Sequence, residues 1–414
     1  MRKQPDSPPP PTTPKEIDKV IAQEREYKLI TPLFGGGVNP GETDPVNLIR
    51  GTEIRGQLRF WWRACRGGQF DSDLAKMKKA EDELWGAAYK KGEETPLQEQ
   101  TVQIAIEKLN PGSSIELFDK RGKPVRELDV PTYAAFPLQP SDANKQAGNP
   151  PKAVQKDVTF KLIISFPKAQ KMEVESALWA WETFGGIGGR TRRGFGALHL
   201  LKVNGLNNSD VPSSRDVRDW IEKKLNTYVT SSKFPENLPH LSTNSQFKVT
   251  KDLRDTLSVW HYLIKRLYGF RQDGRPERSN WPEARAIKQG AYKRDTNQNS
   301  FINKFPRAAF GLPIIFHFVG PKRSVPEDTT LQGDKIERLA SPLILRPLLC
   351  KDERAVGLAL LLEGPPIPPG GLRLIEKGSN KEHAVDAILT QSEANTIPIL
   401  RGETDVLQAF LKYL

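Results

Sequence analysis

The sequence predicts an α+β protein of two ferredoxin-like (RRM-like, β-α-β-β-α-β) domains, the second of them decorated by helical and loop insertions. Two observations predict this fold class. Between residues 27 and 203, segments with the two-residue period of strands and segments with the three-and-four spacing of helices follow in the order strand, helix, strand, strand, helix, strand. The chain of 414 residues also has room for two domains of about 100–200 residues each.

The elements of the first domain are defined by periodicity and by the residues that end them. Strands are expected at 27–30, 101–106, 158–166 and 195–203, and helices at 51–66 and 171–184. Apolar residues of the first helix recur at spacings of three and four, so they share one face. They are Ile54, Leu58, Trp61 and Trp62. Pro167 ends the third strand, because proline lacks the N–H that a ladder needs.

The second half of the chain is less regular. We expect a helix at 253–270, paired strands at 343–349 and 356–362, and helical segments at 385–389 and 406–414. The predicted organisation is a disordered proline-rich tail at 1–22, a first domain at 23–206 with the arginine helix and the Gly-Arg loop, and a second domain at 207–414.

The composition favours a polyanionic partner. The net charge is +12, which points first to nucleic acid and second to an anionic membrane surface. No apolar run approaches the roughly 18 residues of a membrane span, and the N-terminus has no apolar signal core. We therefore expect a cytoplasmic protein without a membrane partner. The two cysteines offer neither a disulfide framework nor a metal-ligand spacing, so we expect no cofactor and no metal.

The helix at 51–66 carries a row of arginines. Their spacings of four, four and three would line one helix face, opposite the apolar stripe, where guanidinium groups can bind phosphate oxygens in pairs. The row consists of Arg55, Arg59, Arg63 and Arg66, and Arg50 precedes the positive N-terminal end of the helix. The alternative is a solvated charged face.

A glycine-rich segment at 184–196 interleaves arginines with an aromatic residue. Glycine lets the main chain approach a ligand and present bare N–H groups, and an aromatic ring can stack on an RNA base. The candidate RNA-binding residues here are Gly188, Gly189, Arg190, Arg192, Arg193 and Phe195. The alternative is an ordinary turn between a helix and a strand.

Two further segments are candidates. The loop that contains Gly36 should lie near the start of the arginine helix and could hold a phosphate or simply turn the chain. A basic region from Lys265 to Arg294, which includes Arg271 and Tyr268, could bind either RNA or a partner protein.

The sequence offers little support for RNA cleavage. Metal-free RNA cleavage needs a histidine or lysine beside the 2′-hydroxyl, but the five histidines are scattered singly, and His261 is expected to be structural. We therefore expect no enzyme and no catalytic residue.

Two motifs resemble a known family. Residues 48–64 resemble the N-terminal signature of the first-numbered subunit family of the Cmr complex, the type III-B CRISPR effector built from RAMP-superfamily proteins. The segment 184–196 resembles the glycine-rich loop of RAMP proteins. Residues 305–313 and 338–345 resemble later blocks of the family in outline.

The resemblance implies a non-catalytic RNA-binding subunit that acts in antiviral defence. Its expected partners are single-stranded RNA, as the 3′ region of the guide or as incoming target, and other RAMP subunits of the complex. Two alternatives stay open: a metal-independent RAMP endoribonuclease that processes guide RNA, and a protein–protein scaffold with a basic surface. The absence of histidine from residues 1–198 counts against the endoribonuclease.

Overall fold

The structure is a computed structural model with mixed α/β architecture and antiparallel sheets. It describes residues 19–37, 43–44, 47–87, 101–125, 129–140, 152–250, 252–253, 255–272, 281–290, 302–318, 326–379 and 381–414. Most of the predicted tail lies outside these residues. The first strand begins at Val20, inside the predicted tail and seven residues before the predicted start at Tyr27.

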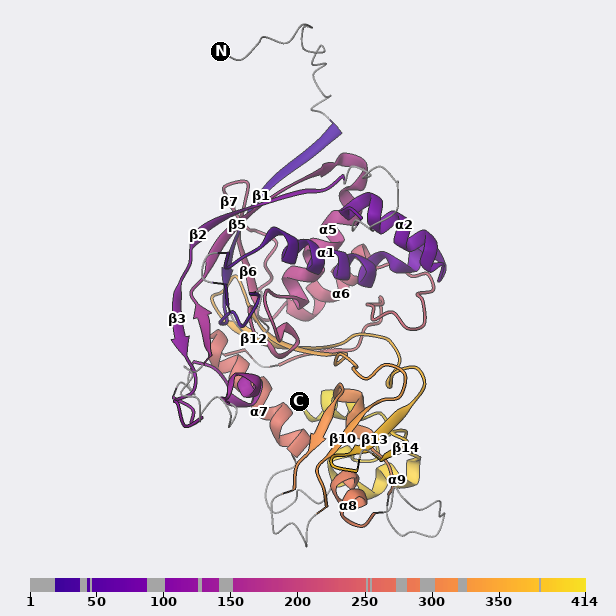
Figure 1. Ribbon diagram of the computed structural model, residues 1–414. Helices are drawn as coiled ribbons and strands as arrows, with labels where there is room; N and C mark the ends of the chain where they lie inside the picture. Colours follow the sequence, from indigo (N-terminus) through magenta and orange to yellow (C-terminus); the bar gives the residue numbers. More distant parts are fainter. Residues whose placement is uncertain are drawn as a thin grey trace, which may run out of the picture.

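The N-terminal half is built on a five-stranded antiparallel sheet with the order β2-β5-β1-β6-β7. Its strands are β1 (Val20–Leu29), β2 (Gln103–Asn110), β5 (Thr159–Pro167), β6 (Leu198–Val203) and β7 (Leu206–Asn207). Helices α1 (Gly51–Arg66) and α5 (Lys171–Phe184) pack together on one face of this sheet, with α2 (Leu74–Trp85) against α1 (Figure 1). The predicted succession of strands and helices is thus present between β1 and β6.

The two faces of this sheet differ in chemistry. The inner face buries Tyr27 and Phe160, whose rings stack at 5.1 Å. The outer face carries paired charges, in which Lys161 lies 3.3 Å from both Glu24 and Glu107. This alternation follows from the two-residue period of strands, because successive side chains point to opposite faces.

The remaining elements of the N-terminal half lie at its margins. A short pair is formed by β3 (Ser113–Glu116) and β4 (Ala153–Lys156), and α3 (Thr132–Ala135) continues into a 3₁₀ turn at Phe136–Leu138. After β7, α6 (Val217–Tyr228) packs on α5.

The C-terminal half contains two smaller sheets. The first has the order β11-β12-β8 and consists of β8 (Phe247–Val249), β11 (Leu343–Leu349) and β12 (Ala355–Leu361). The helix α7 (Thr256–Gln272) packs against β11 and β12. Within the described ranges no fourth strand joins this sheet, so it departs from the complete β-α-β-β-α-β unit that the sequence predicts.

The second sheet has the order β14-β13-β10-β9. Its strands are β9 (Ile314–Phe316), β10 (Thr329–Gly333), β13 (Leu372–Glu376) and β14 (Glu382–Val385). The helices α8 (Pro282–Lys288), α9 (Gln391–Thr396) and α10 (Val406–Tyr413) complete this half. The prediction of a helix at 385–389 is wrong, since short apolar runs do not distinguish strand from helix by periodicity alone.

The two halves share their cores. Side chains on one face of β11 and β12, such as Leu348 and Leu358, belong to the cluster beneath α1 and α5. On the other side, Phe195 of the N-terminal half packs in the cluster of α7. The predicted boundary at 206–207 falls inside β7, which forms a hairpin with β6, and does not separate two independent cores.

Candidate nucleic-acid interface

Two of the α1 arginines bind acceptors on α2. Arg59 Nε donates to Glu81 Oε1 at 2.9 Å, and Arg59 Nη1 donates to the carbonyl oxygen of Gly86 at 2.7 Å. Arg59 Nη2 reaches Asp82 Oδ1 at 3.2 Å, and Arg63 binds the same carboxylate of Glu81. Glu81 is only 3% exposed, so this ion-pair network is largely withdrawn from solvent.

The other two members of the row are also held within the protein. Arg55 Nη1 donates to the carbonyl oxygens of Trp85 at 2.9 Å and Val102 at 3.2 Å. Arg66 Nη2 donates to Glu173 Oε1 at 3.0 Å, in the first turn of α5. These guanidinium groups therefore tie α1 to α2, β2 and α5.

The prediction that Arg55, Arg59, Arg63 and Arg66 face an open groove is wrong. Sequence reasoning assigned no helix to residues 74–85, and α2 folds across the face that was expected to be free. The end of a helix leaves carbonyl oxygens without intrahelical donors and carries partial negative charge, so the C-terminus of α2 is a natural acceptor for these cations.

The glycine-rich loop 185–196 lies against the segment that follows β1. The N–H of Gly188 donates to Glu53 Oε1 at 2.5 Å, and the N–H of Gly189 donates to the carbonyl oxygen of Phe34 at 2.6 Å. A Cβ on Gly188 would come within 2.5 Å of that same carbonyl oxygen, so only glycine fits there. The two predicted bare N–H groups are therefore already used inside the fold.

Phe195 is also withdrawn from any ligand. Its side chain is 0% exposed and packs edge-to-face on Trp260 at 4.8 Å and against Phe34 at 5.6 Å. The prediction that Phe195 stacks on an RNA base is wrong, because the glycines on both sides bring the chain close enough to α7 to bury the ring.

The loop instead holds three arginines in one place and brings a fourth from α7 near them. Arg190 has φ +58° and is partly buried, and its buried Nε has no hydrogen-bond acceptor among the residues that the structure describes. Arg192 lies over the ring of Phe60 at 5.5 Å, and Arg193 Nη1 donates to the carbonyl oxygen of Leu343 at 2.8 Å. These three residues and Arg271, whose Nε also lacks an acceptor within the described ranges, form what we call the arginine cluster.

Among the described residues, the arginine cluster gathers positive charge without a compensating carboxylate. Burial, together with the charges of Arg271, Arg190 and Arg192, lowers the pKa of Arg193 to about 9. Burial and Arg271 likewise lower the pKa of Arg190. In the part of the chain that the structure describes, none of the four meets a carboxylate within ion-pair distance. Such a site is stabilised by an anion, since neighbouring like charges disfavour each other.

The guanidinium group of Arg193 is engaged inside the fold. Besides Leu343, its guanidinium donates to the carbonyl oxygens of Arg192 at 3.0 Å and Phe310 at 3.3 Å. Its charge adds to that of Arg190 and Arg271, whose buried Nε atoms have no acceptor among the described residues. These hydrogen bonds leave Arg193 fewer free donors for a direct RNA contact, which stays a prediction.

The N-terminal end of α1 carries the carboxyl group of Glu53. Burial raises the pKa of Glu53, while the N–H of Gly188 and the charge of Arg50 lower it. A Cβ on Gly36 would lie 3.6 Å from Glu53 Oε2, so the loop after β1 reaches the start of α1, as predicted. Because the carboxylate of Glu53 is already beside Arg50, this helix end is less suited to phosphate than the sequence indicated.

The outer face of the five-stranded sheet differs from that of an RNA-binding RRM sheet, which displays aromatic rings for stacking. Here the face displays Lys161 between two glutamates and the pair Lys202–Glu26 at 3.3 Å, which sets three carboxylates against two ammonium groups. Paired charges of opposite sign give no net attraction for a polyanion, so we place the candidate interface at the arginine cluster.

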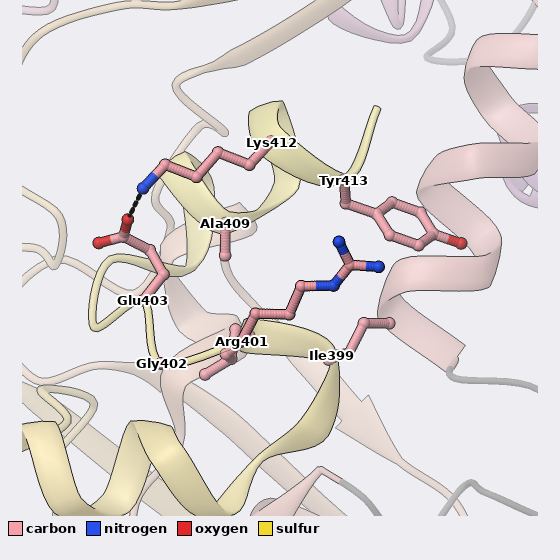
Figure 2. A pocket seen from close by; sticks show the side chains of 8 residues that line it. Ile399, Arg401, Gly402, Glu403, Ala409, Lys412 and Tyr413 are labelled. Atoms are coloured by element: carbon pink, nitrogen blue, oxygen red, sulfur yellow. Dashed lines mark hydrogen bonds and ion pairs between the residues drawn. The ribbon is translucent and has the colours of Figure 1, made fainter.

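A small pocket of about 190 Å³ lies at α10. Figure 2 shows Arg401 extending across it toward Tyr413, while Lys412 turns to the carboxylate of Glu403. Arg266 lies over the ring of Tyr413 at 3.7 Å. In this pocket, Lys412 is thus neutralised by Glu403, and the ring of Tyr413 is covered by Arg266. The pocket is therefore a weaker candidate for RNA than the arginine cluster.

Sequence reasoning missed Tyr133, which affects the pKa of both Arg190 and Arg193 and therefore lies beside the arginine cluster. The pair Tyr133 and Phe136, spaced by three between Pro131 and Pro137, was the available signal. Of the predicted basic region, Lys265, Tyr268 and Arg271 lie on α7, and residues 273–280 and 291–300 lie outside the described residues.

The described residues provide neither a metal site nor a membrane-spanning helix. Within the described ranges, no group of three or more His, Cys, Asp or Glu side chains is arranged to hold a metal ion. Among those residues, no helix combines the length and apolar character that crossing a bilayer demands. Both cysteines, Cys65 and Cys350, are buried and free.

Sequence comparison finds similarity to one family model and to two known proteins. A model of the RAMP superfamily matches residues 26–199. The CRISPR system Cmr subunit Cmr1-1 of Pyrococcus furiosus is 23% identical over 268 residues, which cover 64% of this chain and 70% of that protein. Cmr1-2 of the same organism is 22% identical over 196 residues, which cover 42% of this chain and 92% of that protein.

Solved structures are similar at lower identity. The crystal structure of Cmr1 from Pyrococcus furiosus in its apo form has 16% identity and a TM-score of 0.48, and the match covers 84% of this chain and 90% of that one. A chain of the cryo-EM structure of the Type III-B Cmr-beta bound to cognate target RNA has 14% identity and a TM-score of 0.49, and the match covers 95% of this chain and 100% of that one.

Proposed function

We propose that this chain, which is homologous to Cmr1 subunits and carries a RAMP-superfamily domain at residues 26–199, is an RNA-binding subunit of a type III-B (Cmr) CRISPR ribonucleoprotein in antiviral defence. The observation that carries the proposal is the arginine cluster, in which four guanidinium groups gather without a carboxylate in the described part of the chain. Phosphate oxygens are the anions that guanidinium groups recognise best.

The proposed ligand is single-stranded RNA, either the 3′ region of the guide or the incoming target. The relatives are Cmr subunits, and one of the similar structures has cognate target RNA bound, which supports this choice of ligand. The partners would be other RAMP subunits of the complex, and the compartment would be the cytoplasm.

The proposed role is non-catalytic and needs no cofactor. The arginine cluster carries positive charge and buried carbonyl contacts, which suit holding a backbone rather than moving protons. A general acid or base must instead lie within hydrogen-bond reach of the 2′-hydroxyl with a pKa near the working pH.

Metal-independent cleavage of guide RNA is the second candidate. One observation favours it: His261, Lys265 and Tyr133 line a single groove next to the arginine cluster, and such side chains can transfer protons without a metal. Incubation of the purified chain with labelled repeat RNA separates the two functions. A defined cut that is lost in His261→Ala would establish the endoribonuclease and displace the non-catalytic role.

The test of RNA binding is a salt titration. The double variant Arg190→Gln/Arg271→Gln should weaken binding of a 12-nucleotide single-stranded RNA and reduce the slope of log K against log salt by about 1.4, because about 0.7 is lost per phosphate contact on single strands. Arg354→Gln is the matched control, since Arg354 is 59% exposed and paired with Asp252 at 2.6 Å, away from the cluster. An unchanged slope in the double variant would remove the arginine cluster from the interface. Tight binding to an acidic protein without binding to RNA would favour the scaffold instead.

A further inference from the structure

We propose that a groove between α3 and α7 receives the unstacked bases of the same RNA strand whose phosphates lie on the arginine cluster, an inference that rests on the proposed function. The groove has a volume of about 520 Å³, within the usual range for ligand clefts of about 300–1,000 Å³. Its aromatic and cationic lining consists of Phe118, Tyr133, Phe136, His261, Lys265 and Tyr268.

The groove is walled by exposed rings. Phe136 is 69% exposed and Tyr268 is 44% exposed, which leaves two large rings open to water. Tyr133 meets Tyr268 edge-to-face, with ring centroids 5.2 Å apart and planes at 72°. In such a pair one ring keeps a face that its partner does not cover, and this face is available for a base. Stacking on aromatic side chains is the common means of holding unpaired bases.

The floor of the groove is rigid and apolar. Phe118 is 3% exposed and Ile264 is 1% exposed, and both belong to well-packed parts of the fold. The short helix α3 packs on α7 beside this floor (Figure 1). The rings above it are therefore fixed to two elements that contact each other, so little ordering is needed when a base enters.

The charge around the groove selects a nucleic acid over a neutral peptide. Lys265 and Arg271 lie one turn before and after Tyr268 on α7, which puts a cation on either side of the ring. Burial lowers the pKa of Arg190 and Tyr133 opposes that lowering, so the phenol that lines the groove also adjoins the arginine cluster. No aspartate or glutamate is among the described residues that line the groove.

The geometry predicts a preference for single strands. Bases inside a duplex are stacked on their neighbours and cannot turn into a groove, whereas unpaired bases can be splayed out onto aromatic rings. Stacking tolerates any base, because every base has a π-face. The groove should therefore discriminate between single and double strands with little dependence on sequence.

The experiment measures affinities of the full-length chain for a fluorescein-labelled 12-nucleotide uridine RNA, an adenosine RNA of the same length, and a 12-base-pair RNA duplex. Tyr268→Leu and Phe136→Leu keep apolar bulk but remove the rings. Each should weaken single-strand binding by roughly 5- to 100-fold and reduce the preference for single strands, with the salt slope unchanged. Tyr262→Leu is the matched control, because Tyr262 is an exposed tyrosine of the same helix at 37% exposure that does not line the groove.

The outcomes separate this inference from the proposed function. If the ring variants bind single-stranded RNA like the unchanged protein while the Arg190/Arg271 variant does not, the groove proposal fails and the proposed function stands. If the ring variants lose association with neighbouring subunits but keep their RNA affinity, the groove is a protein-docking surface and the proposal also fails. If the unchanged chain binds no RNA, both fail.

Discussion

The guanidinium group of Arg346 donates from Nη1 to the carbonyl oxygen of Gly185 at 2.8 Å, where the glycine-rich loop begins. The same side chain donates to the carbonyl oxygens of Glu182 at 2.9 Å and Leu198 at 2.7 Å. Arg346 is 0% exposed, and burial lowers its pKa to about 9. One buried residue of β11 therefore fixes both ends of the loop that carries the arginine cluster.

Replacement of Arg346 tests this attachment. Arg346→Met keeps a long side chain but removes the donor from four carbonyl oxygens, the three above and that of Pro347, and each buried group left unsatisfied costs about 1–3 kcal/mol. We expect the free energy of unfolding, measured by urea denaturation, to fall by about 3 kcal/mol. The control is Arg354→Met, since an exposed ion pair contributes at most about 1 kcal/mol. Equal effects of the two substitutions would contradict the assignment.

Glu81 tests the structural role of the α1 arginines. Glu81→Gln removes the charge that compensates Arg59 and Arg63 at a site that is 3% exposed. Breaking a buried pair leaves uncompensated charge, so we expect a loss of about 2 kcal/mol in unfolding free energy. The salt slope of RNA binding should stay unchanged. Glu83→Gln on the same helix is the control, because Glu83 is 42% exposed and lies 4.0 Å from Lys79.

Alanine substitutions at two glycines with similar φ angles distinguish the cost of a positive φ from the cost of a steric clash. Gly188 has φ +81° and Gly205 has φ +77°, so alanine at either position meets the left-handed penalty of about 1–2 kcal/mol. Only Gly188 adds a clash, with Phe34 O 2.5 Å from the new Cβ, whereas Gly205 has open space. Gly188→Ala should therefore be less stable than Gly205→Ala by about 1–3 kcal/mol in thermal or urea unfolding. Similar losses would mean that the loop can move away from Phe34.

His199 predicts a pH dependence of stability. Burial lowers its pKa to about 4, with Arg346 and Lys28 adding to the effect. The unfolded chain, with an ordinary histidine pKa of about 6.5, binds more protons between these values, so folding stability falls as pH decreases through that window. We expect this histidine to lower the unfolding free energy by about 2 kcal/mol between pH 7.5 and pH 5. His199→Asn should remove that part of the decrease, and identical profiles for both proteins would refute the assignment.

Local periodicity accounts for what the sequence predicted correctly. The three-and-four spacing of Ile54, Leu58 and Trp61 identified α1, and Leu343–Leu349 was expected to pair with the strand that follows it. Contacts between distant segments account for most of the errors. The spacing of Arg55 and Arg59 was read correctly as one helix face, but their partners on α2 depend on how a later helix folds back.

In the candidate site too, contacts between distant segments could not be predicted from the sequence. The glycine-rich loop was found from its composition, and Arg190 and Arg192 remain in the interface that we propose. Phe195 was assigned to a ligand because sequence does not reveal that Trp260 covers its ring. The groove was missed because Tyr133 and Tyr268 are far apart in the chain and meet only through the packing of α3 on α7.

The shared core also determines how this protein can be dissected. Leu348, Val356 and Leu358 fill the space beneath α1 and α5, although they follow in sequence more than 140 residues after β6 ends at Val203. A truncated protein that stops near residue 206 would expose that apolar surface to water and would aggregate. Deletion mapping would therefore mistake misfolding for loss of ligand contact, so the interface must be mapped by point substitutions in the intact chain.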